Sequence, residues 1–361
     1  MPEAGAYARP MESQAKTVLV TGGSGFLGGW CVVELLRRGY RVRTTVRDLA
    51  REPEVRAAVE PEAGGGELSF FAADLTSDAG WAEAVEGCDH VLHVASPFPP
   101  AQPKDPDELI VPAREGTLRV LRLALAAGVE RVVVTSSVAA VSGGASPASS
   151  PLDEGSWTDL ENPNLSPYVR SKTIAERAAW ELVDEAGASR RLAVVNPGAI
   201  LGPALTADRS FSLEMVERLL KGVPGAPRIG FTIVDVRDVA DLHIRAMTDP
   251  AAGGERFVAA TEFLWMAEVA AVLRANLGEA ASRVPKRTLP DFLVRAMGIF
   301  DPGVRSITNQ LGKKISYSSA KAENQLGWSP RPVEETVVEC GRSIVAQSAA
   351  GASRAATASR R

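Results

Sequence analysis

Tyr168 and Lys172 are the residues of this sequence whose types and spacing point most directly to chemistry. Residues four apart lie on one face of a helix, so a phenol and an ammonium at this spacing can point into the same cleft. A free tyrosine has a pKa of about 10, and a neighbouring ammonium favours its ionised form. Bringing that pKa to about 7 would take roughly 4 kcal/mol. The pair therefore predicts proton transfer at a carbonyl or carbinol oxygen.

Ser136 and Ser137 end the predicted strand 131–137 and could add a hydroxyl to such a site. The carboxyl ends of parallel strands are where an open α/β sheet builds its site. A hydroxyl there can hydrogen-bond the oxygen that the tyrosine protonates. Serines are also frequent wherever a strand turns into a loop, so the residues alone do not choose between the two hydroxyls.

The segment 20–28, VTGGSGFLG, follows an apolar strand and opens a helix. It fits a GxGxxG pattern through Gly23, Gly25 and Gly28 and a TGxxGxxG pattern through Gly22, Gly25 and Gly28. Glycines allow the tight turn, the approach of the backbone to a pyrophosphate and the close packing of helix on strand. The helix N-terminus would bind the pyrophosphate. The turn therefore predicts a dinucleotide site in the first βαβ unit.

The end of the second predicted strand indicates which dinucleotide is bound. An NAD site places an acidic residue there to hold the ribose hydroxyls. This sequence places Arg47 at that point, with Arg51 one turn later, and a guanidinium pairs well with a 2′-phosphate. Asp48 keeps NAD(H) open as the less favoured cofactor, and NADP(H) is the prediction.

Alternating strands and helices must position these residues. The first 200 residues predict a Rossmann-type, doubly wound parallel sheet of the α/β class, with helices on both faces. Ser166 and Pro167 begin the helix that carries the tyrosine. The predicted strands are 17–21, 41–47, 68–73, 89–95, 131–137 and 191–196, and the predicted helices are 25–38, 79–86, 107–127 and 167–185.

After Pro197 the pattern becomes irregular, which predicts a smaller mixed C-terminal substrate lobe. It contains helices near 210–221 and 266–277 and strands near 231–234 and 256–259. We expect a flexible leader over 1–15, an NADP-binding Rossmann domain over 16–200 with its sheet completed by 228–260, a substrate-binding lobe over 201–227 and 261–345, and a flexible tail over 346–361.

Composition excludes several other classes. The apolar fraction is 45%, and 40 Lys and Arg residues face 44 Asp and Glu residues without a dense basic block, so no nucleic-acid partner is expected. No apolar run of about 18 residues occurs, so no membrane partner is expected. Cys31, Cys88 and Cys340 and the histidines His90, His93 and His243 lack metal spacing and are expected to pack in the core, with no metal bound. A cytoplasmic location fits these features.

The chain resembles the extended short-chain dehydrogenase/reductases over about 16–345. The branch that it resembles most contains dihydroflavonol reductases, cinnamoyl-CoA reductases and related bacterial aldehyde and ketone reductases. The motifs that carry the resemblance are VTGGSGFLG (20–28), TTVRD (44–48), ADL (73–75), HVASP (93–97), EGT (115–117), VVVTSS (132–137), YVRSKTIAERAAW (168–180), NPGAILGP (196–203) and DVRDVADLHIRAM (235–247).

The resemblance implies roles for the catalytic positions. Tyr168 would be the general acid in reduction, and Ser137 would polarise the substrate carbonyl with it, Ser136 being the alternative. Lys172 would hold the nicotinamide ribose and lower the pKa of Tyr168. The residues implied to border the cofactor are Gly22, Gly25, Phe26, Leu27, Gly28, Arg47 at the 2′-phosphate, Asp74 and Leu75 at the adenine, Ala95 and Ser96 along its middle, Tyr168, Lys172, and Pro197 and Gly198 by the nicotinamide.

The sequence also departs from the branch. Residues 164–168 are NLSPY, not the NWYCY-type signature of cinnamoyl-CoA reductases, which disfavours a CoA thioester. The loop after Ser137 is rich in small residues and carries no evident flavonoid-binding polar group. Apolar residues that could form a pocket wall are Phe98, Pro99, Pro100, Phe211, Met215 and Phe231. We therefore expect an NADPH-dependent carbonyl reductase or alcohol dehydrogenase for an apolar or aromatic aldehyde or ketone.

Two other functions remain open. A nucleotide-sugar epimerase or dehydratase of the same superfamily would retain a tightly bound NAD. A non-catalytic NADP-sensing protein would need only the cofactor site, and the presence of Tyr168 argues against it. The resemblance also allows a homodimer.

Overall fold

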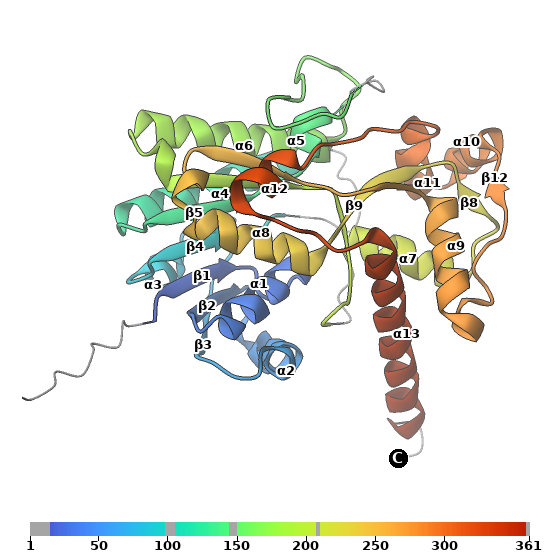
Figure 1. Ribbon diagram of the computed structural model, residues 1–361, viewed down its shortest axis with the longest axis horizontal. Coiled ribbons are helices and arrows are strands. Elements are labelled where there is room, and N and C mark those ends of the chain that lie inside the picture. Colours follow the sequence, from blue (N-terminus) through green and yellow to red (C-terminus); the bar gives the residue numbers. More distant parts are fainter. Residues whose placement is uncertain (1–14, 98–104, 144–149, 207–209, 359–361) are drawn as a thin grey trace, which may run out of the picture.

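The computed structural model describes residues 15–97, 105–143, 150–206 and 210–358. Its centre is a sheet of seven parallel strands in the order β10-β6-β5-β4-β1-β2-β3 (Figure 1). The strands are β1 (Thr17–Thr21), β2 (Arg41–Val46), β3 (Leu68–Ala72), β4 (His90–His93), β5 (Arg131–Thr135), β6 (Leu192–Pro197) and β10 (Glu255–Ala259). The predicted Rossmann-type fold is confirmed.

The central strands are mostly apolar and are buried along their whole length because helices cover both faces of the sheet. All residues of β1, β4 and β6 are buried. On one face α1 packs against α8, and on the other α4 packs against α6 (Figure 1). The helices of the two faces are α1 (Phe26–Arg37), α2 (Glu52–Ala63), α8 (Val236–Thr248) and α12 (Ala320–Leu326) on the first, and α3 (Trp81–Val85), α4 (Asp107–Ala126) and α6 (Pro167–Glu185) on the second.

A smaller lobe follows β6 and has a core of its own. Two small sheets, β11-β9-β7 and β12-β8, lie among its helices. The strands are β7 (Ala199–Leu201), β8 (Ala226–Pro227), β9 (Gly230–Asp235), β11 (Phe263–Trp265) and β12 (Thr288–Leu289). The helices are α7 (Phe211–Lys221), α9 (Met266–Asn276), α10 (Asp291–Phe300), α11 (Pro302–Ile307) and α13 (Val333–Ala358), and a short helix α5 (Ala139–Ser142) follows β5.

One expectation about the sheet needs correction. Residues 228–260 were expected to complete the main sheet, but only β10 joins it, beside β6. The strand β9 instead pairs in parallel with β7 and antiparallel with β11. The physical reason is that the chain turns out of the main sheet after Pro197, and β7 then offers β9 a free edge in the smaller lobe.

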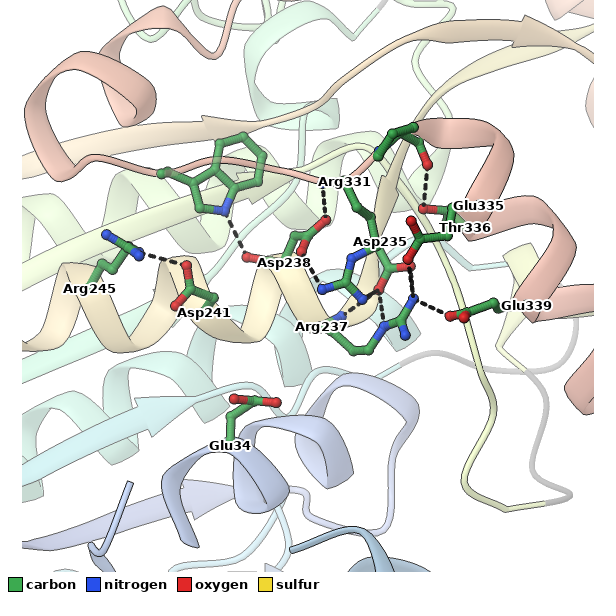
Figure 2. A network of polar contacts seen from close by, with 12 residues as sticks. Glu34, Asp235, Arg237, Asp238, Asp241, Arg245, Arg331, Glu335, Thr336 and Glu339 are labelled. Atoms are coloured by element: carbon green, nitrogen blue, oxygen red, sulfur yellow. Dashed lines mark hydrogen bonds and ion pairs between the residues drawn. The ribbon is translucent and has the colours of Figure 1, made fainter. Parts of the chain in front are cut away.

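A network of charged side chains ties α8 to the C-terminal part of the chain (Figure 2). Arg237 Nη2 pairs with Asp235 Oδ2 at 2.8 Å and with Glu339 Oε2 of α13 at 2.5 Å. Arg331 Nη2 pairs with Asp238 Oδ1 at 3.0 Å, and its backbone amide donates to Oδ2 of the same carboxylate at 2.8 Å. The network fixes the start of α8, which underlies β5 and β6, to the helix that ends the chain.

The expected flexible tail is also corrected, because α13 continues through residues 346–358. This stretch is rich in alanine, which has the highest intrinsic helix propensity, and it extends a helix that is already packed on α9 and α7. The predicted leader over 1–15 lies almost entirely outside the described residues. Among the residues that are described, no helix is long and apolar enough to cross a membrane.

Candidate functional site

The helix α6 begins where the sequence predicted and carries Tyr168 and Lys172. The Ser166 side chain caps it by accepting the amide of Val169 at 3.3 Å, and Pro167 occupies its first position. The cap fixes the first turn, so the two functional side chains start from a defined backbone. Lys172 is buried at 9% exposure, and Tyr168 is half-buried.

Tyr168 shares a hydrogen bond with Ser137, which lies two residues beyond the end of β5. Withdrawal from water raises the pKa of the Tyr168 phenol above its ordinary value, and the bond with Ser137 lowers that pKa by a smaller amount. The phenol therefore carries its proton at neutral pH. A protonated phenol beside a serine hydroxyl can bind a carbonyl oxygen and donate a proton to it.

Ser136 points into a different environment. Its hydroxyl donates to Oε2 of Glu176, a carboxylate of α6 with no exposed side-chain surface. Asn196 Nδ2 donates to the same oxygen at 2.7 Å and to the Ser137 carbonyl at 3.1 Å. Ser136 is thus committed to a buried structural network, whereas the Ser137 hydroxyl faces Tyr168.

The buried carboxylate of Glu176 is balanced by Arg256 of β10. Arg256 Nε donates to Glu176 Oε1 at 2.5 Å, and the guanidinium lies over the ring of Trp157, 3.6 Å from its centroid. Its Nη1 also donates to the carbonyls of Glu154 and Ser156, at 2.8 and 3.1 Å. One ion pair therefore connects the Tyr168 helix, the main sheet and the part of the loop after Ser137 that includes Glu154–Trp157.

The surroundings of Lys172 disfavour its charge. Burial lowers the pKa of the Lys172 ammonium to about 8, against the opposing effect of Glu176 one turn away. Its Nζ donates to the Thr135 carbonyl at the end of β5, at 3.3 Å. This contact holds the ammonium at the same strand end as Ser137.

The glycine turn has the geometry of a dinucleotide cradle. Gly22 has a φ of 72°, a left-handed conformation that favours glycine. A Cβ on Gly28 would lie 2.2 Å from the carbonyl oxygen of Gly22, so helix and turn could not pack this closely with a side chain there. Gly25 precedes α1 at the N-cap position and offers no side-chain cap to the first amides of the helix, which suits an anion at this helix end. The residues of the cradle therefore fit a pyrophosphate.

Arg47 and Asp48, adjacent at the end of β2, have different surroundings in the structure. Arg47 is exposed, whereas the Asp48 carboxylate caps the 3-10 turn Leu49–Arg51 by accepting the amide of Ala50 at 2.9 Å. Asp74 lies nearby: hydrogen bonds from Thr76 lower the pKa of its carboxyl most, and the charge of Arg47 lowers it further. Arg47 thus lies close enough for its charge to act on Asp74, which was predicted to border the adenine.

Other predicted cofactor residues lie near the same carboxyl-terminal ends of the strands of the main sheet. Ala95 lies against Gly22, since a Cβ added to Gly22 would lie 3.1 Å from the Ala95 Cβ. Leu75 packs on Gly116 of α4, where a Cβ would lie 2.9 Å from the Leu75 Cβ. Phe26 and Leu27 form the first turn of α1, and Ser96 follows Ala95 in the loop after β4.

Pro197 and Gly198 lie at the end of β6, and the structure adds a packing reason for the glycine. A Cβ on Gly198 would lie 2.3 Å from the carbonyl oxygen of Thr232 in β9. The Pro197 carbonyl accepts the amide of Val138 at 3.0 Å, which holds the turn after Ser137 close to this strand end.

Apolar side chains of the smaller lobe form a wall around a small gap just beyond Gly198, with room for about one water molecule. Met215 and Phe231, two of the residues predicted for a pocket wall, line it. Phe211 is 44% exposed, and Phe98, Pro99 and Pro100 lie outside the described residues. The full lining is Ala199, Leu201, Met215, Val216, Phe231, Ile233, Leu264, Met266 and Val269.

Sequence analysis did not identify Glu176, Arg256 or His93 as part of the site. Glu176 lies four residues after Lys172 on the same helix face, and Arg256 lies in an otherwise apolar predicted strand. An acidic and a basic residue on two elements that must both be buried could have suggested the pair. His93 was assigned to strand packing, and it is buried in β4.

Comparison with known proteins shows similarity to a family of epimerases and dehydratases and to several reductases. Residues 18–260 match the model of the NAD dependent epimerase/dehydratase family. A cinnamoyl-CoA reductase of Medicago truncatula is 39% identical over 244 residues, which are 66% of this chain and 74% of that protein. A dihydroflavonol 4-reductase of Zea mays is 35% identical over 279 residues, which are 74% and 76% of the two chains.

The fold extends the similarity to almost the whole chain. The structure of yeast methylglyoxal/isovaleraldehyde reductase Gre2, complexed with NADPH, superimposes with a TM-score of 0.77 and 25% sequence identity. The match covers 92% of this chain and 99% of that one. Both the Rossmann-type sheet and the smaller lobe therefore have counterparts in a solved reductase.

Proposed function

The chain belongs to the NAD dependent epimerase/dehydratase family, and from this we propose that it is an NADPH-dependent carbonyl reductase for an apolar or aromatic aldehyde or ketone. The observation that carries the proposal is the hydrogen bond between Tyr168 and Ser137 beside a buried Lys172 at the end of β5. These three residues form the catalytic set that we propose. The similar proteins named above are reductases, which supports the same reaction class.

The cofactor is NADP(H). Its pyrophosphate fits the glycine cradle, and Arg47 is the residue that would hold the 2′-phosphate, since Asp48 already caps its own turn. Ala95 and Ser96 would border its middle, Asp74 and Leu75 its adenine end, and Pro197 and Gly198 its nicotinamide end. When bound, NADPH would supply a hydride to the carbonyl carbon.

Tyr168 and Ser137 act on the oxygen of the substrate. Both hydroxyls can donate to the carbonyl oxygen, which draws electron density from the carbonyl carbon. As negative charge develops on that oxygen, Tyr168 gives up its proton as the general acid. The raised pKa of the phenol keeps this proton in place until the oxygen becomes more basic than the tyrosine.

Lys172 supplies positive charge to the same site. Its ammonium, fixed to the Thr135 carbonyl, stabilises the phenolate that remains after proton transfer and would hold a ribose hydroxyl of the cofactor. Because burial lowers the pKa of Lys172 to about 8, this charge is present at neutral pH and is lost under mildly alkaline conditions.

The apolar wall beside the site favours a substrate with an aliphatic or aromatic body. It lies directly after the strand end that carries Pro197 and Gly198, and none of its lining residues is charged. The absence of the NWYCY-type signature at 164–168 disfavours a CoA thioester. A homodimer and a cytoplasmic location stay predictions from the sequence.

The test is NADPH oxidation by the pure protein with a panel of aromatic and aliphatic aldehydes and ketones. We expect turnover with several apolar carbonyl compounds and its loss in Tyr168→Phe. Copurified NAD together with turnover of a nucleotide sugar without added cofactor would instead establish an epimerase or dehydratase. Tight NADPH binding with no turnover of any carbonyl compound would favour a sensing role.

A further inference from the structure

His93 ends β4 between the two strands that build the site. On one side it lies in register with Thr21 of β1, which precedes the glycine turn. On the other it lies in register with Val134 of β5, whose neighbour Thr135 accepts the Lys172 ammonium. The side chain is only 2% exposed, so its hydrogen bonds must be satisfied inside the protein.

The contacts of Thr21 determine which ring nitrogen of His93 carries the proton. The Thr21 hydroxyl oxygen accepts the amides of Val94 and Ala95, both at 3.0 Å. These two bonds use both acceptor positions of the hydroxyl, so its own proton must point to His93 Nδ1, also at 3.0 Å. Burial, helped by the charge of Lys172, lowers the pKa of His93 to about 3, so the ring is neutral. The remaining proton is therefore on Nε2.

The Nε2–H group has no hydrogen-bond partner among the described residues, although it is buried. Lys172 lies close enough for its charge to act on His93, and only one of its three donor hydrogens is accounted for by Thr135. An ammonium and an N–H group are both donors and cannot bond to each other. Both can be satisfied by one acceptor that lies between them.

We propose that His93 is a positioning residue, whose Nε2–H and the Lys172 ammonium donate to one shared hydroxyl-type oxygen. A water molecule and a sugar hydroxyl of the bound cofactor share this chemistry. The oxygen would fix the direction of the ammonium and stabilise its charge. The inference rests on the proposed function only for its kinetic consequence, because the hydrogen-bond argument concerns the protein alone.

The consequence is a shift in the titration of Lys172. Among the described residues, the titratable groups whose charge interacts with this ammonium are Glu176 on α6 and His93 on β4. An oxygen that accepts from an ammonium favours the charged form, so its loss lowers the pKa of Lys172 further. His93→Phe keeps a planar ring and removes the donor. His93→Gln keeps an N–H donor near the position of Nε2 and serves as the matched control.

The experiment measures the pKa of Lys172 by competitive labelling with acetic anhydride across pH, read on the Lys172 peptide by mass spectrometry. We expect His93→Phe to lower this pKa by about one unit and His93→Gln to leave it near that of the unmodified protein. A shift in cofactor-free protein identifies the oxygen as water. A shift that appears only with saturating NADP⁺ identifies a sugar hydroxyl.

Two results would overturn the proposal. One is an unchanged Lys172 pKa in His93→Phe under both conditions. The other is an equal change of the Lys172 pKa in His93→Phe and His93→Gln, which would show that the packing of the ring, and not its N–H donor, sets that pKa. Urea unfolding of both variants checks that each is folded. The labelling works without catalysis, so failure of the reductase proposal leaves this result readable. If the enzyme is active, the alkaline limb of kcat shifts with the same pKa in His93→Phe.

Discussion

Ser136 and Ser137 are adjacent in the chain, yet their hydroxyls bind two different residues of the same helix. Ser136 donates to the buried carboxylate of Glu176, and Ser137 shares a hydrogen bond with Tyr168. Glu176 lies two turns after Tyr168 on α6. The end of β5 is thus bonded to α6 at two points. The Ser136–Glu176 contact is structural, and the Ser137–Tyr168 contact can bind a substrate.

The two serines should respond differently to alanine. Ser137→Ala removes a donor to the substrate oxygen, and we expect kcat to fall about 100-fold or more with little change in stability. Ser136→Ala leaves Glu176 short of one donor, and we expect a loss of about 1–3 kcal/mol in the free energy of unfolding. Steady-state kinetics and urea unfolding of both variants check this. The assignment would be wrong if Ser136→Ala were the variant with the larger fall in kcat.

The activity should depend on the charge of Lys172. Its pKa of about 8 predicts a reduction rate that is flat below that pH and falls as the ammonium loses its proton above it. Tyr168 does not cause this limb, because its pKa is raised and it remains protonated there. The measurement is kcat against pH. Lys172→Arg should move the limb far upward wherever residual activity permits its detection, since a guanidinium stays charged. A limb unchanged in that variant would contradict the assignment.

Arg47 should decide between the two dinucleotides. Arg47→Ala removes a charge-assisted bond worth about 1.5–3 kcal/mol, so we expect kcat/KM for NADPH to fall about 10- to 100-fold. The value for NADH should hardly change, because NADH has no 2′-phosphate. Arg51→Ala is the matched control, since Arg51 Nε pairs with Glu54 at 3.1 Å. An equal loss with both dinucleotides would show that Arg47 does not bind the phosphate.

Gly28 should tolerate no side chain. In Gly28→Ala the new Cβ would lie 2.2 Å from the Gly22 carbonyl, and both groups are backbone-fixed. We expect a destabilisation of about 1–3 kcal/mol and loss of measurable NADPH binding by fluorescence titration. Gly155→Ala, whose nearest atom would be a side-chain oxygen of Asp153 at 3.3 Å, should bind NADPH normally. Unimpaired binding by Gly28→Ala would contradict the cradle.

Glu176 and Arg256 should be strongly coupled. Removing one member of a buried ion pair leaves an uncompensated charge, so Glu176→Gln and Arg256→Met should each cost about 3–5 kcal/mol. The double variant should cost clearly less than the two single costs together, because it leaves no lone charge. Urea unfolding of the four proteins gives the coupling energy. Additive costs would show that the two side chains do not act as a pair.

Local patterns predicted the parts of the site that are built locally. The bounds of α6, Pro167–Glu185, follow from Ser166, Pro167 and Gly187, and the structure has the same bounds. The glycine turn and the strand before it were also visible, because spacing and capping depend on neighbours in the chain. The Rossmann-type parallel sheet with helices on both faces followed from the alternation of strands and helices. These features need no information about distant contacts.

Long-range contacts determine the parts of the fold and of the site that were not predicted from the sequence. Glu176 and Arg256 are 80 residues apart, and no local pattern shows that they meet. The choice of Ser137 over Ser136 depends on that same pair. The helix α2 was not predicted because Pro61 lies within it and three glycines follow it, features typical of a loop. In each case tertiary packing outweighed the local preference.

The network that joins α8 to the end of the chain has a consequence for synthesis. Asp238 pairs with Arg331, which is synthesised 93 residues later, and Arg237 pairs with Glu339 in α13. These contacts cannot form until the later residues have been made. At about 5–20 residues per second, a ribosome needs roughly 5–20 s to make that interval. Through this time the start of α8 carries Asp238 without Arg331, and Arg237 is paired with Asp235 but not with Glu339. We expect this stretch to be the point at which a newly made chain most needs protection from aggregation.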